Sequence, residues 1–295
     1  MKNTIDIIID TDIGNDIDDT WAIVYALLND RFCVKAICVT GCDTEYKACL
    51  IAKILTNLNR SDVAIIKGVP DGEPFAPQKA WIGNFTLSDF RGKVFDDTRK
   101  GFEQYLKNGT VVIGLASNST LAFVRDILLR KNAKVVAMAG SVFKGYFGNP
   151  NPVPECNVVT DTEASKKLYA SGVNYTMLPL DVCGNIVLEG AKYERVRDSH
   201  SIAARIVTEN YFVWNRDYIG GAKKYDIKKS STVLYDMIPF FYLEKPEAFS
   251  VQKMKIGINE RGITEESENG VGMQVAVGVQ DLEEFYVKMT ELLVK

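Results

Sequence analysis

The sequence predicts an α/β fold with an open, mostly parallel central sheet flanked by helices, in a single domain that spans residues 1–295. Two observations carry this prediction. Short apolar runs alternate with helix-like stretches of about 10–15 residues, which is typical of a parallel sheet covered by helices. The chain has no repeat, no low-complexity tract and no linker rich in Pro, Gly or Ser that would divide it.

The first half of the chain supplies the alternating elements. Apolar runs predict strands at residues 4–10, 34–39, 63–67, 110–113, 134–138 and 175–178. The stretches between them predict helices at residues 18–28, 44–57, 120–129 and 162–171. In such sheets the chemistry gathers at the carboxyl ends of the strands. The last third has helical patterns at residues 201–214 and 281–293, and we expect a helical part that packs on the same sheet.

The composition excludes several classes of function. Apolar residues make up 46% and charged residues 25%, as in ordinary globular proteins, and the net charge of −3 gives no bulk attraction to nucleic acid or to anionic membranes. No apolar run approaches the roughly 18 residues of a membrane span, and Asp6 and Asp10 interrupt the first apolar stretch, unlike in a signal peptide. We therefore expect a cytoplasmic protein that binds a small molecule, with no nucleic-acid or membrane partner.

Cysteine and histidine usage narrows the chemistry further. The six cysteines form no Cys-x-x-Cys pair, so free thiols in a reducing compartment are a better interpretation than a zinc site. The only histidine, His200, stands where an amphipathic helix is expected to begin, which indicates a surface or capping role. Catalytic triads built on Ser-His or Cys-His are therefore disfavoured.

The most informative segment is IIIDTDIGNDIDDTWAI, at the end of the first expected strand. It contains Asp10, Asp12, Asp16, Asp18 and Asp19, and no Lys or Arg occurs between residues 3 and 30. Two carboxylates about 4 Å apart repel by roughly 1 kcal/mol in water and about 4 kcal/mol at an effective dielectric constant of 20. A helix N-terminus relieves one or two such charges. Five are better explained by a hard divalent cation, and Ca2+ accepts flexible shells rich in carboxylates.

Three other interpretations of this segment are weaker. A solvated acidic turn needs only one capping aspartate. An EF-hand loop would place glycine at Asn15 and glutamate at Trp21, so it fails. A phosphatase of the haloacid dehalogenase type also has Asp-x-Asp after an apolar strand, but it usually carries Thr or Val where this chain has Gly14.

The segment resembles the fingerprint of the inosine–uridine-preferring nucleoside hydrolase family, Asp-x-Asp-x-Gly-x-Asp-Asp-x-x-Ala. Asp12 matches the second family aspartate, and Asp18 and Asp19 match the closing pair. Two extra residues separate Gly14 from that pair, so Asp16 has no certain counterpart.

Later segments match the same family in order. VTGCD at residues 39–43 resembles a Gly-Asn turn, which implies that Asp43 accepts a hydrogen bond from a ribose hydroxyl; a plain loop aspartate is the alternative. IGLASNSTLA at residues 113–122 resembles Gly-Pro-Leu-Thr-Asn, in which a backbone carbonyl, here that of Ser117, completes the metal shell.

The segment at residues 148–164 carries the most specific of these later matches. Asn149, Glu155 and Asn157 reproduce the spacing Asn-x5-Glu-x-Asn, which in the family holds ribose hydroxyls. Met138 matches a family methionine that packs against the sugar, and core filling is an equal alternative.

VLYDMIPFFYL at residues 233–243 resembles Leu-His-Asp-Pro-Leu, the segment that supplies the last metal ligand, here Asp236. An acidic residue in an apolar stretch is costly unless it is paired, which independently favours a ligand. The resemblance therefore implies one Ca2+ held by Asp12, Asp19, Asp236 and the Ser117 carbonyl.

The reaction implied is hydrolysis of the N-glycosidic bond of a ribonucleoside to ribose and free base. Asp12 would take a proton from the attacking water, which the metal activates. Asp18 and Glu155 would stabilise the oxocarbenium-like transition state. The resemblance to the family also implies that the protein assembles as a homodimer or homotetramer.

Activation of the leaving base departs from the family pattern. Tyr235 stands where members with broad specificity carry histidine, and Asn84 stands where others have His-Gly. Tyr235 is the candidate acid, and stacking of the base on an aromatic side chain such as Trp214 is the alternative. We expect a different base specificity from the broad members. A ribose- or nucleoside-binding protein without efficient chemistry is the second hypothesis.

Overall fold

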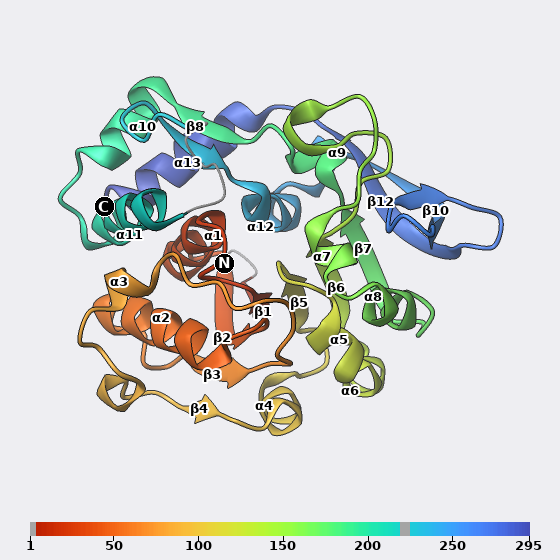
Figure 1. The fold of residues 1–295 in the computed structure, drawn as a ribbon, viewed down its shortest axis with the longest axis horizontal. Helices are drawn as coiled ribbons and strands as arrows, with labels where there is room; N and C mark the ends of the chain where they lie inside the picture. Colours follow the sequence, from red (N-terminus) through yellow and green to blue (C-terminus); the bar gives the residue numbers. More distant parts are fainter. Residues whose placement is uncertain (1–3, 219–224) are drawn as a thin grey trace.

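The computed structural model describes residues 4–218 and 225–295, and a ten-stranded sheet runs through these residues in the order β11-β10-β12-β7-β6-β5-β1-β2-β3-β4 (Figure 1). Its strands are β1 (Ile5–Thr11), β2 (Phe32–Val39), β3 (Ala64–Lys67), β4 (Val94–Phe95), β5 (Val111–Gly114), β6 (Lys134–Met138), β7 (Asn174–Leu178), β10 (Phe249–Ile258), β11 (Thr264–Glu266) and β12 (Val271–Val279). A separate pair consists of β8 (Val187–Glu189) and β9 (Ser230–Val233).

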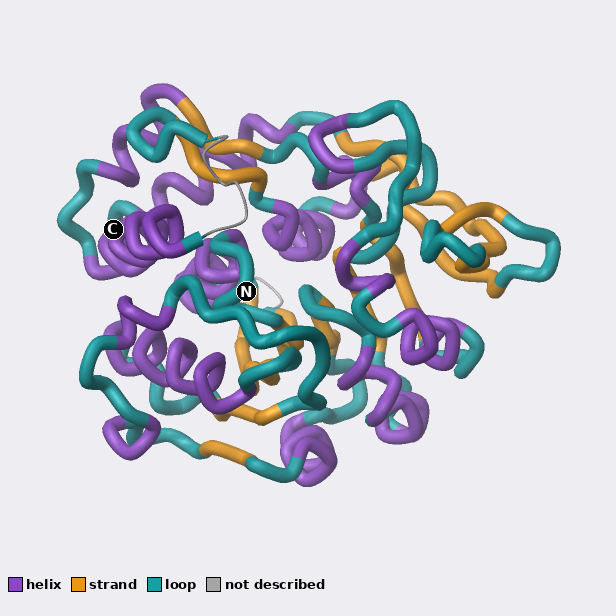
Figure 2. Tube along the Cα trace, in the orientation of Figure 1, coloured by secondary structure: helices purple, strands orange, loops and turns teal. Residues whose placement is uncertain are grey.

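Helices surround the strands on both faces of the sheet (Figure 2). The longer ones are α1 (Asp18–Leu28), α2 (Thr44–Asn57), α4 (Thr98–Tyr105), α8 (Thr162–Tyr169), α10 (Gly190–Arg197), α11 (Ile202–Asp217) and α13 (Leu282–Leu293). The shorter ones are α3 (Lys79–Ile82), α5 (Ser119–Phe123), α6 (Arg125–Arg130), α7 (Cys156–Val159), α9 (Leu180–Cys183) and α12 (Ile238–Glu244). Short 3-10 turns include η2 (Tyr146–Gly148) and η4 (Tyr235–Met237).

The strand pairing confirms the predicted α/β class. β1 pairs in parallel with β2 on one side and with β5 on the other. The chain therefore runs outward from β1 through β2, β3 and β4, and then returns to the opposite side of β1 as β5. The gap beyond the carboxyl ends of β1 and β5 is a topological switch point, where open α/β sheets bind their ligands.

The apolar side chains of β1 show that both faces of the sheet are buried. Ile7 and Ile9 pack on one face with the core residues of α1, α2, α11 and α13, whereas Ile8 packs on the other face with those of α4, α5, α6 and α8. All three isoleucines are fully buried. Successive side chains of a strand point to opposite faces, so a strand covered on both sides reads as a continuous apolar run.

The last third of the chain differs from the prediction of a mainly helical part. α11 and α13 form close to the predicted helices, but the chain also adds β10, β11 and β12 to the sheet, and they extend from its right side in Figure 1. β12 is parallel to β7, and β10 is antiparallel to β12 and to β11. The predicted helix at residues 120–129 is also divided at Val124 into α5 and α6.

Among residues 4–218 and 225–295, no helix combines the length and the apolar character that crossing a membrane requires.

Candidate active site

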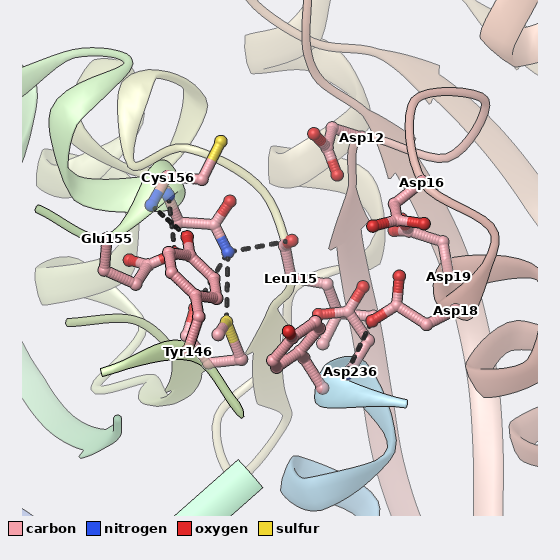
Figure 3. Close-up of a pocket in the computed structure, with 12 residues that line it drawn as sticks. Asp12, Asp16, Asp18, Asp19, Leu115, Tyr146, Glu155, Cys156 and Asp236 are labelled. Carbon is pink, nitrogen blue, oxygen red and sulfur yellow. Dashed lines mark hydrogen bonds between the residues drawn. The ribbon is translucent and has the colours of Figure 1, made fainter. Parts of the chain in front are cut away.

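A pocket opens where β1 and β5 end, and it is strongly acidic. Figure 3 shows its aspartates on one side, with Tyr146, Glu155 and Cys156 facing them across the cavity. The residues that line it are Asp12, Asp16, Asp18, Asp19, Leu115, Met138, Tyr146, Glu155, Cys156, Asn157, Tyr235 and Asp236.

Three carboxylates from two distant segments meet in this pocket. Asp18 and Asp19 form the first turn of α1, where the free N–H groups of the helix favour negative charge. Asp236 lies in η4, and its backbone N–H donates a hydrogen bond to Asp18 Oδ2 over 3.2 Å. One carboxylate oxygen from each of the three residues lies within 4.8 Å of the others. The structure thus brings together residues that are more than 200 positions apart.

These carboxylates are deeply buried, which makes their charge costly. Asp18, Asp19 and Asp236 are 3%, 1% and 4% exposed. Burial raises the pKa of each one well above its ordinary value, and the neighbouring carboxylates raise it further. Protonation and a bound cation are the two ways to relieve this repulsion. A compact set of carboxylate oxygens suits a hard cation such as Ca2+, so these three residues fit an ion of that kind. The set contains Asp19 and Asp236 as predicted, with Asp18 in the place where the resemblance implies Asp12.

Asp12 enters the same pocket from the loop between β1 and α1 (Figure 3). Asn15 Nδ2 donates a hydrogen bond to Asp12 Oδ2 over 2.9 Å. Loss of solvent raises the pKa of Asp12, and the nearby positive charge of Lys47 opposes that rise. Asp19 is oriented by the hydroxyl of Thr11, which donates to Asp19 Oδ1.

The opposite wall carries groups that can bind hydroxyls. Glu155 is buried and accepts hydrogen bonds from the backbone N–H groups of Gly140 (2.8 Å), Asn157 (2.8 Å) and Val158 (3.2 Å). Burial raises the pKa of Glu155 to about 7, and these N–H groups oppose the rise. Asn157 Nδ2 donates to the carbonyl oxygens of Leu115 (3.1 Å) and Met138 (3.0 Å), which leaves the amide oxygen as its remaining acceptor.

Two tyrosines form an aromatic wall. The rings of Tyr146 and Tyr235 lie edge to face, with their centroids 5.7 Å apart and an angle of 88° between the planes. The Tyr146 hydroxyl accepts a hydrogen bond from the backbone N–H of Cys156 over 2.9 Å. Burial raises the pKa of Tyr235, so its phenol stays protonated near neutral pH. The chain's only histidine, His200, is exposed between α10 and α11 and does not line this pocket.

A family model described as inosine-uridine preferring nucleoside hydrolase matches residues 7–286. The chain belongs to this family. Membership confirms the predicted family and the predicted class of enzyme, an N-ribosyl hydrolase.

Individual relatives agree with this assignment. The chain is 26% identical over 276 residues to the pyrimidine-specific ribonucleoside hydrolase RihA of Shewanella woodyi, covering 87% of this chain and 84% of that protein. It is 22% identical to uridine nucleosidase 1 of Arabidopsis thaliana, over 87% of this chain and 79% of the relative. The solved purine-preferring ribonucleoside hydrolase from Gardnerella vaginalis has the same fold, with a TM-score of 0.77, 23% identity, and coverage of 98% and 99% of the two chains.

Two residues predicted from the nucleoside hydrolase pattern lie outside the pocket. Asp43 is the N-cap of α2, where its carboxylate accepts from the backbone N–H of Tyr46 over 2.9 Å, and it borders a separate cavity. Asn149 is exposed after η2, and its side-chain oxygen accepts from the N–H of Asn151 over 3.0 Å. In both cases a local hydrogen bond to the backbone occupies a side-chain oxygen, and the residue does not line the acidic pocket.

Ser117 and Trp214, which are also predicted as site residues, are not among the residues that line the pocket. The Ser117 hydroxyl donates to Asp71, and Leu115, two residues earlier, lines the pocket instead. The ladder between β1 and β5 continues as far as Leu115, whose N–H bonds to the Asp10 carbonyl over 2.7 Å, and the chain then turns into α5. Trp214 is 2% exposed, and its indole N–H donates to the Asn15 carbonyl over 3.0 Å, so it supports the loop between β1 and α1 and does not line the pocket.

Three residues that line the pocket are not predicted from the sequence: Cys156, Leu115 and Tyr146. Cys156 lies between the candidates Glu155 and Asn157, and this adjacency was the available signal. Leu115 directly follows β5, where ligand groups are expected. Tyr146 comes from an irregular turn whose direction the sequence pattern does not indicate.

Proposed function

We propose that this nucleoside hydrolase uses one Ca2+ to cleave the N-glycosidic bond of a ribonucleoside, releasing ribose and the free base. The observation that carries the proposal is the meeting of the buried carboxylates of Asp18, Asp19 and Asp236 within 4.8 Å. Asp12, Asp19 and Asp236 would hold the ion, with a backbone carbonyl from residues 115–117 as a further oxygen ligand. When bound, the ion supplies positive charge that orients vicinal hydroxyls and makes water more acidic.

Asp12 is proposed as the general base. Its Oδ2 accepts the hydrogen bond from Asn15, so Oδ1 is the oxygen that takes the proton from the attacking water. In the ion-free pocket, loss of solvent raises the pKa of Asp12, and the positive charge of Lys47 opposes the rise.

The ribose is proposed to lie between the two walls of the pocket. Asp18 and Glu155 accept hydrogen bonds from its hydroxyls, and the Asn157 amide oxygen provides another acceptor. Met138 offers an apolar contact to the ring. Negative charge on Asp18 and Glu155 also favours the oxocarbenium-like transition state, in which the sugar becomes positively charged.

The leaving base is proposed to sit against Tyr146 and Tyr235, whose edge-to-face arrangement presents both an aromatic surface and a phenolic proton. The Tyr235 hydroxyl then protonates the departing base. The names of the two relatives, a pyrimidine-specific hydrolase and a uridine nucleosidase, make uridine the first substrate to test.

A second candidate function follows from the exposed position of His200, because no imidazole is available at the pocket to protonate a base. Under this alternative the protein binds ribose or a nucleoside and has little catalytic activity. An assay of free ribose separates the two candidates. The protein is incubated, with Ca2+ or with EDTA, with each of five nucleosides: uridine, cytidine, inosine, adenosine and guanosine. We expect ribose release with Ca2+ and none with EDTA. Saturable nucleoside binding without any release of ribose would support the binder.

A homodimer or homotetramer and a cytoplasmic location stay predictions for this protein. Light scattering coupled to gel filtration measures the first, and fractionation of cells that produce the protein measures the second.

A further inference from the structure

The loop from Asp12 to Asp16, here called the aspartate loop, is held by side chains from other elements. Each of its five backbone carbonyls accepts a side-chain hydrogen bond. The pairs are Asp12 with Lys47 Nζ (2.5 Å), Ile13 with Lys47 Nζ (3.0 Å), Gly14 with the Tyr46 hydroxyl (3.2 Å), Asn15 with Trp214 Nε1 (3.0 Å) and Asp16 with Gln78 Nε2 (2.6 Å). The two residues that exceed the family fingerprint fall between Gly14 and Asp18, a stretch that begins inside this loop.

Lys47 makes the central contacts beneath the aspartate loop. Its side chain is fully buried, although it extends from α2 toward a site of buried carboxylates. The ammonium group has three donors, and the carbonyls of Asp12 and Ile13 and the Asn15 side-chain oxygen (2.9 Å) occupy all three. Gly41 leaves room for it, since a Cβ at that position would lie 2.8 Å from Lys47 Cε.

The ammonium of Lys47 also determines how Asn15 is oriented. Lys47 can only donate, so the amide oxygen of Asn15 must face it, and the amide nitrogen must point the other way. That nitrogen is the donor to Asp12 Oδ2 at 2.9 Å. A continuous path of two hydrogen bonds therefore runs from the buried ammonium through one amide to the carboxylate that lines the pocket.

We propose that Lys47 and Asn15 are positioning residues that hold the Asp12 carboxylate in its working orientation. The proposal rests on the proposed role of Asp12 as metal ligand and base. Replacing Lys47 or Asn15 removes these hydrogen bonds, so the Asp12 side chain can rotate and the aspartate loop can shift. The hydrogen bonds that hold Asp19 and Glu155 do not involve either residue. The effect is therefore a loss of turnover or of Ca2+ affinity, beyond any loss of stability.

The test compares Asn15→Ala and Lys47→Met with the parent protein and with Lys53→Met. Lys53 is the matched control because it lies on the same helix and its ammonium donates to two backbone carbonyls, those of Trp81 (2.5 Å) and Ile82 (3.1 Å), away from the pocket. We measure kcat and KM on uridine at saturating Ca2+, the dissociation constant for Ca2+ alone by calorimetry, and the melting temperature.

Asn15→Ala and Lys47→Met are both expected to lose fivefold or more in kcat or in Ca2+ affinity, and the KM is expected to change by less than the kcat. Lys53→Met is expected to keep the parent's kcat and Ca2+ affinity. Less than a fivefold loss in both readouts overturns the proposal, whatever happens to the melting temperature. If Lys47→Met does not fold, Asn15→Ala decides alone, since it leaves the ammonium in place. Asp12→Asn separates the two failures: if it also retains kcat and Ca2+ affinity, the proposed role of Asp12 is wrong.

Discussion

At the scale of single residues, the pocket is defined by carboxyl groups that burial makes reluctant to ionise. Burial and the neighbouring negative charges raise the pKa of Asp18, Asp19 and Asp236 well above the ordinary 3.8, and burial is the main reason that the pKa of Asp16 rises to about 6. Acidic groups buried at such a cost, with a fixed mutual geometry, support the proposal that this site binds positive charge.

Calcium binding is expected to weaken as the pH falls. Raised pKa values mean that the ion-free pocket holds protons at pH values where free aspartate has lost them, and Ca2+ must displace these protons. Lowering the pH therefore stabilises the ion-free state and raises the dissociation constant, by about tenfold per pH unit for each proton displaced. Calorimetry between about pH 6 and pH 8, in two buffers of different ionisation enthalpy, measures both the affinity and the protons released. A constant affinity without proton release would contradict the raised pKa values.

Tyr235 is expected to act as the acid for the leaving base. Tyr235→Phe removes only the phenolic oxygen, so we predict a fall in kcat of roughly 100-fold, within the range for general acid catalysis, and a nearly unchanged KM. Tyr211→Phe is the control, because the Tyr211 hydroxyl bonds to the Ser230 carbonyl over 3.3 Å and does not line the pocket. Steady-state kinetics on the best substrate decide the matter. An unchanged kcat in Tyr235→Phe would leave aromatic stacking as the way in which the base is activated.

At the scale of elements, the sequence predicts α1 and α2 at their observed bounds, because both follow a strand and carry apolar residues at helical spacing. The sequence does not predict β10 and β12, which lie next to the β11 edge of the sheet. Only scattered positions of β10 are buried, and a register shift between Ser250 and Val251 interrupts the alternation that would reveal a strand. Antiparallel strands with polar positions on both faces give a weaker signal than the continuous apolar run of β1.

The role of Asp43 in this structure is to cap the N-terminus of α2. Asp43→Ala is expected to lower the free energy of unfolding by about 1 kcal/mol, because the first turn of α2 loses its side-chain acceptor. The KM for nucleoside should stay within about twofold, since Asp43 does not line the pocket. Asp97→Ala, which removes the equivalent cap of α4, is the matched control for denaturant unfolding. A large rise in KM for Asp43→Ala alone would restore the ribose contact that the family resemblance implies.

At the scale of the whole molecule, the site depends on topology. Part of the pocket's lining could be predicted, because Asp12, Asp18, Asp19, Glu155, Asn157 and Asp236 stand in recognisable motifs, and all of them line one pocket. The side-chain directions of Asn149 and Trp214 could not be predicted, because a local turn at Asn151 and a contact with the distant Asn15 carbonyl set them. The predicted role of Ser117 belongs to its backbone carbonyl, which the hydrogen bond from its hydroxyl to Asp71 does not test.

The same topology explains why the pocket is acidic and buried at once. The return of the chain from β4 to β5 leaves a gap beyond the carboxyl ends of β1 and β5, and the loop after β1, the start of α1 and the distant turn η4 close around it. Repulsion among these carboxylates opposes folding, and a cation that links the first and last thirds of the chain would remove it.

The most direct test of this account is a crystal structure of the protein with Ca2+, in which the ion is located by its anomalous signal. We predict one ion per chain, with carboxylate oxygens of Asp12, Asp19 and Asp236 at about 2.3–2.6 Å. A pocket in which the ion is absent at saturating Ca2+, or an ion bound at another set of residues, would contradict the account.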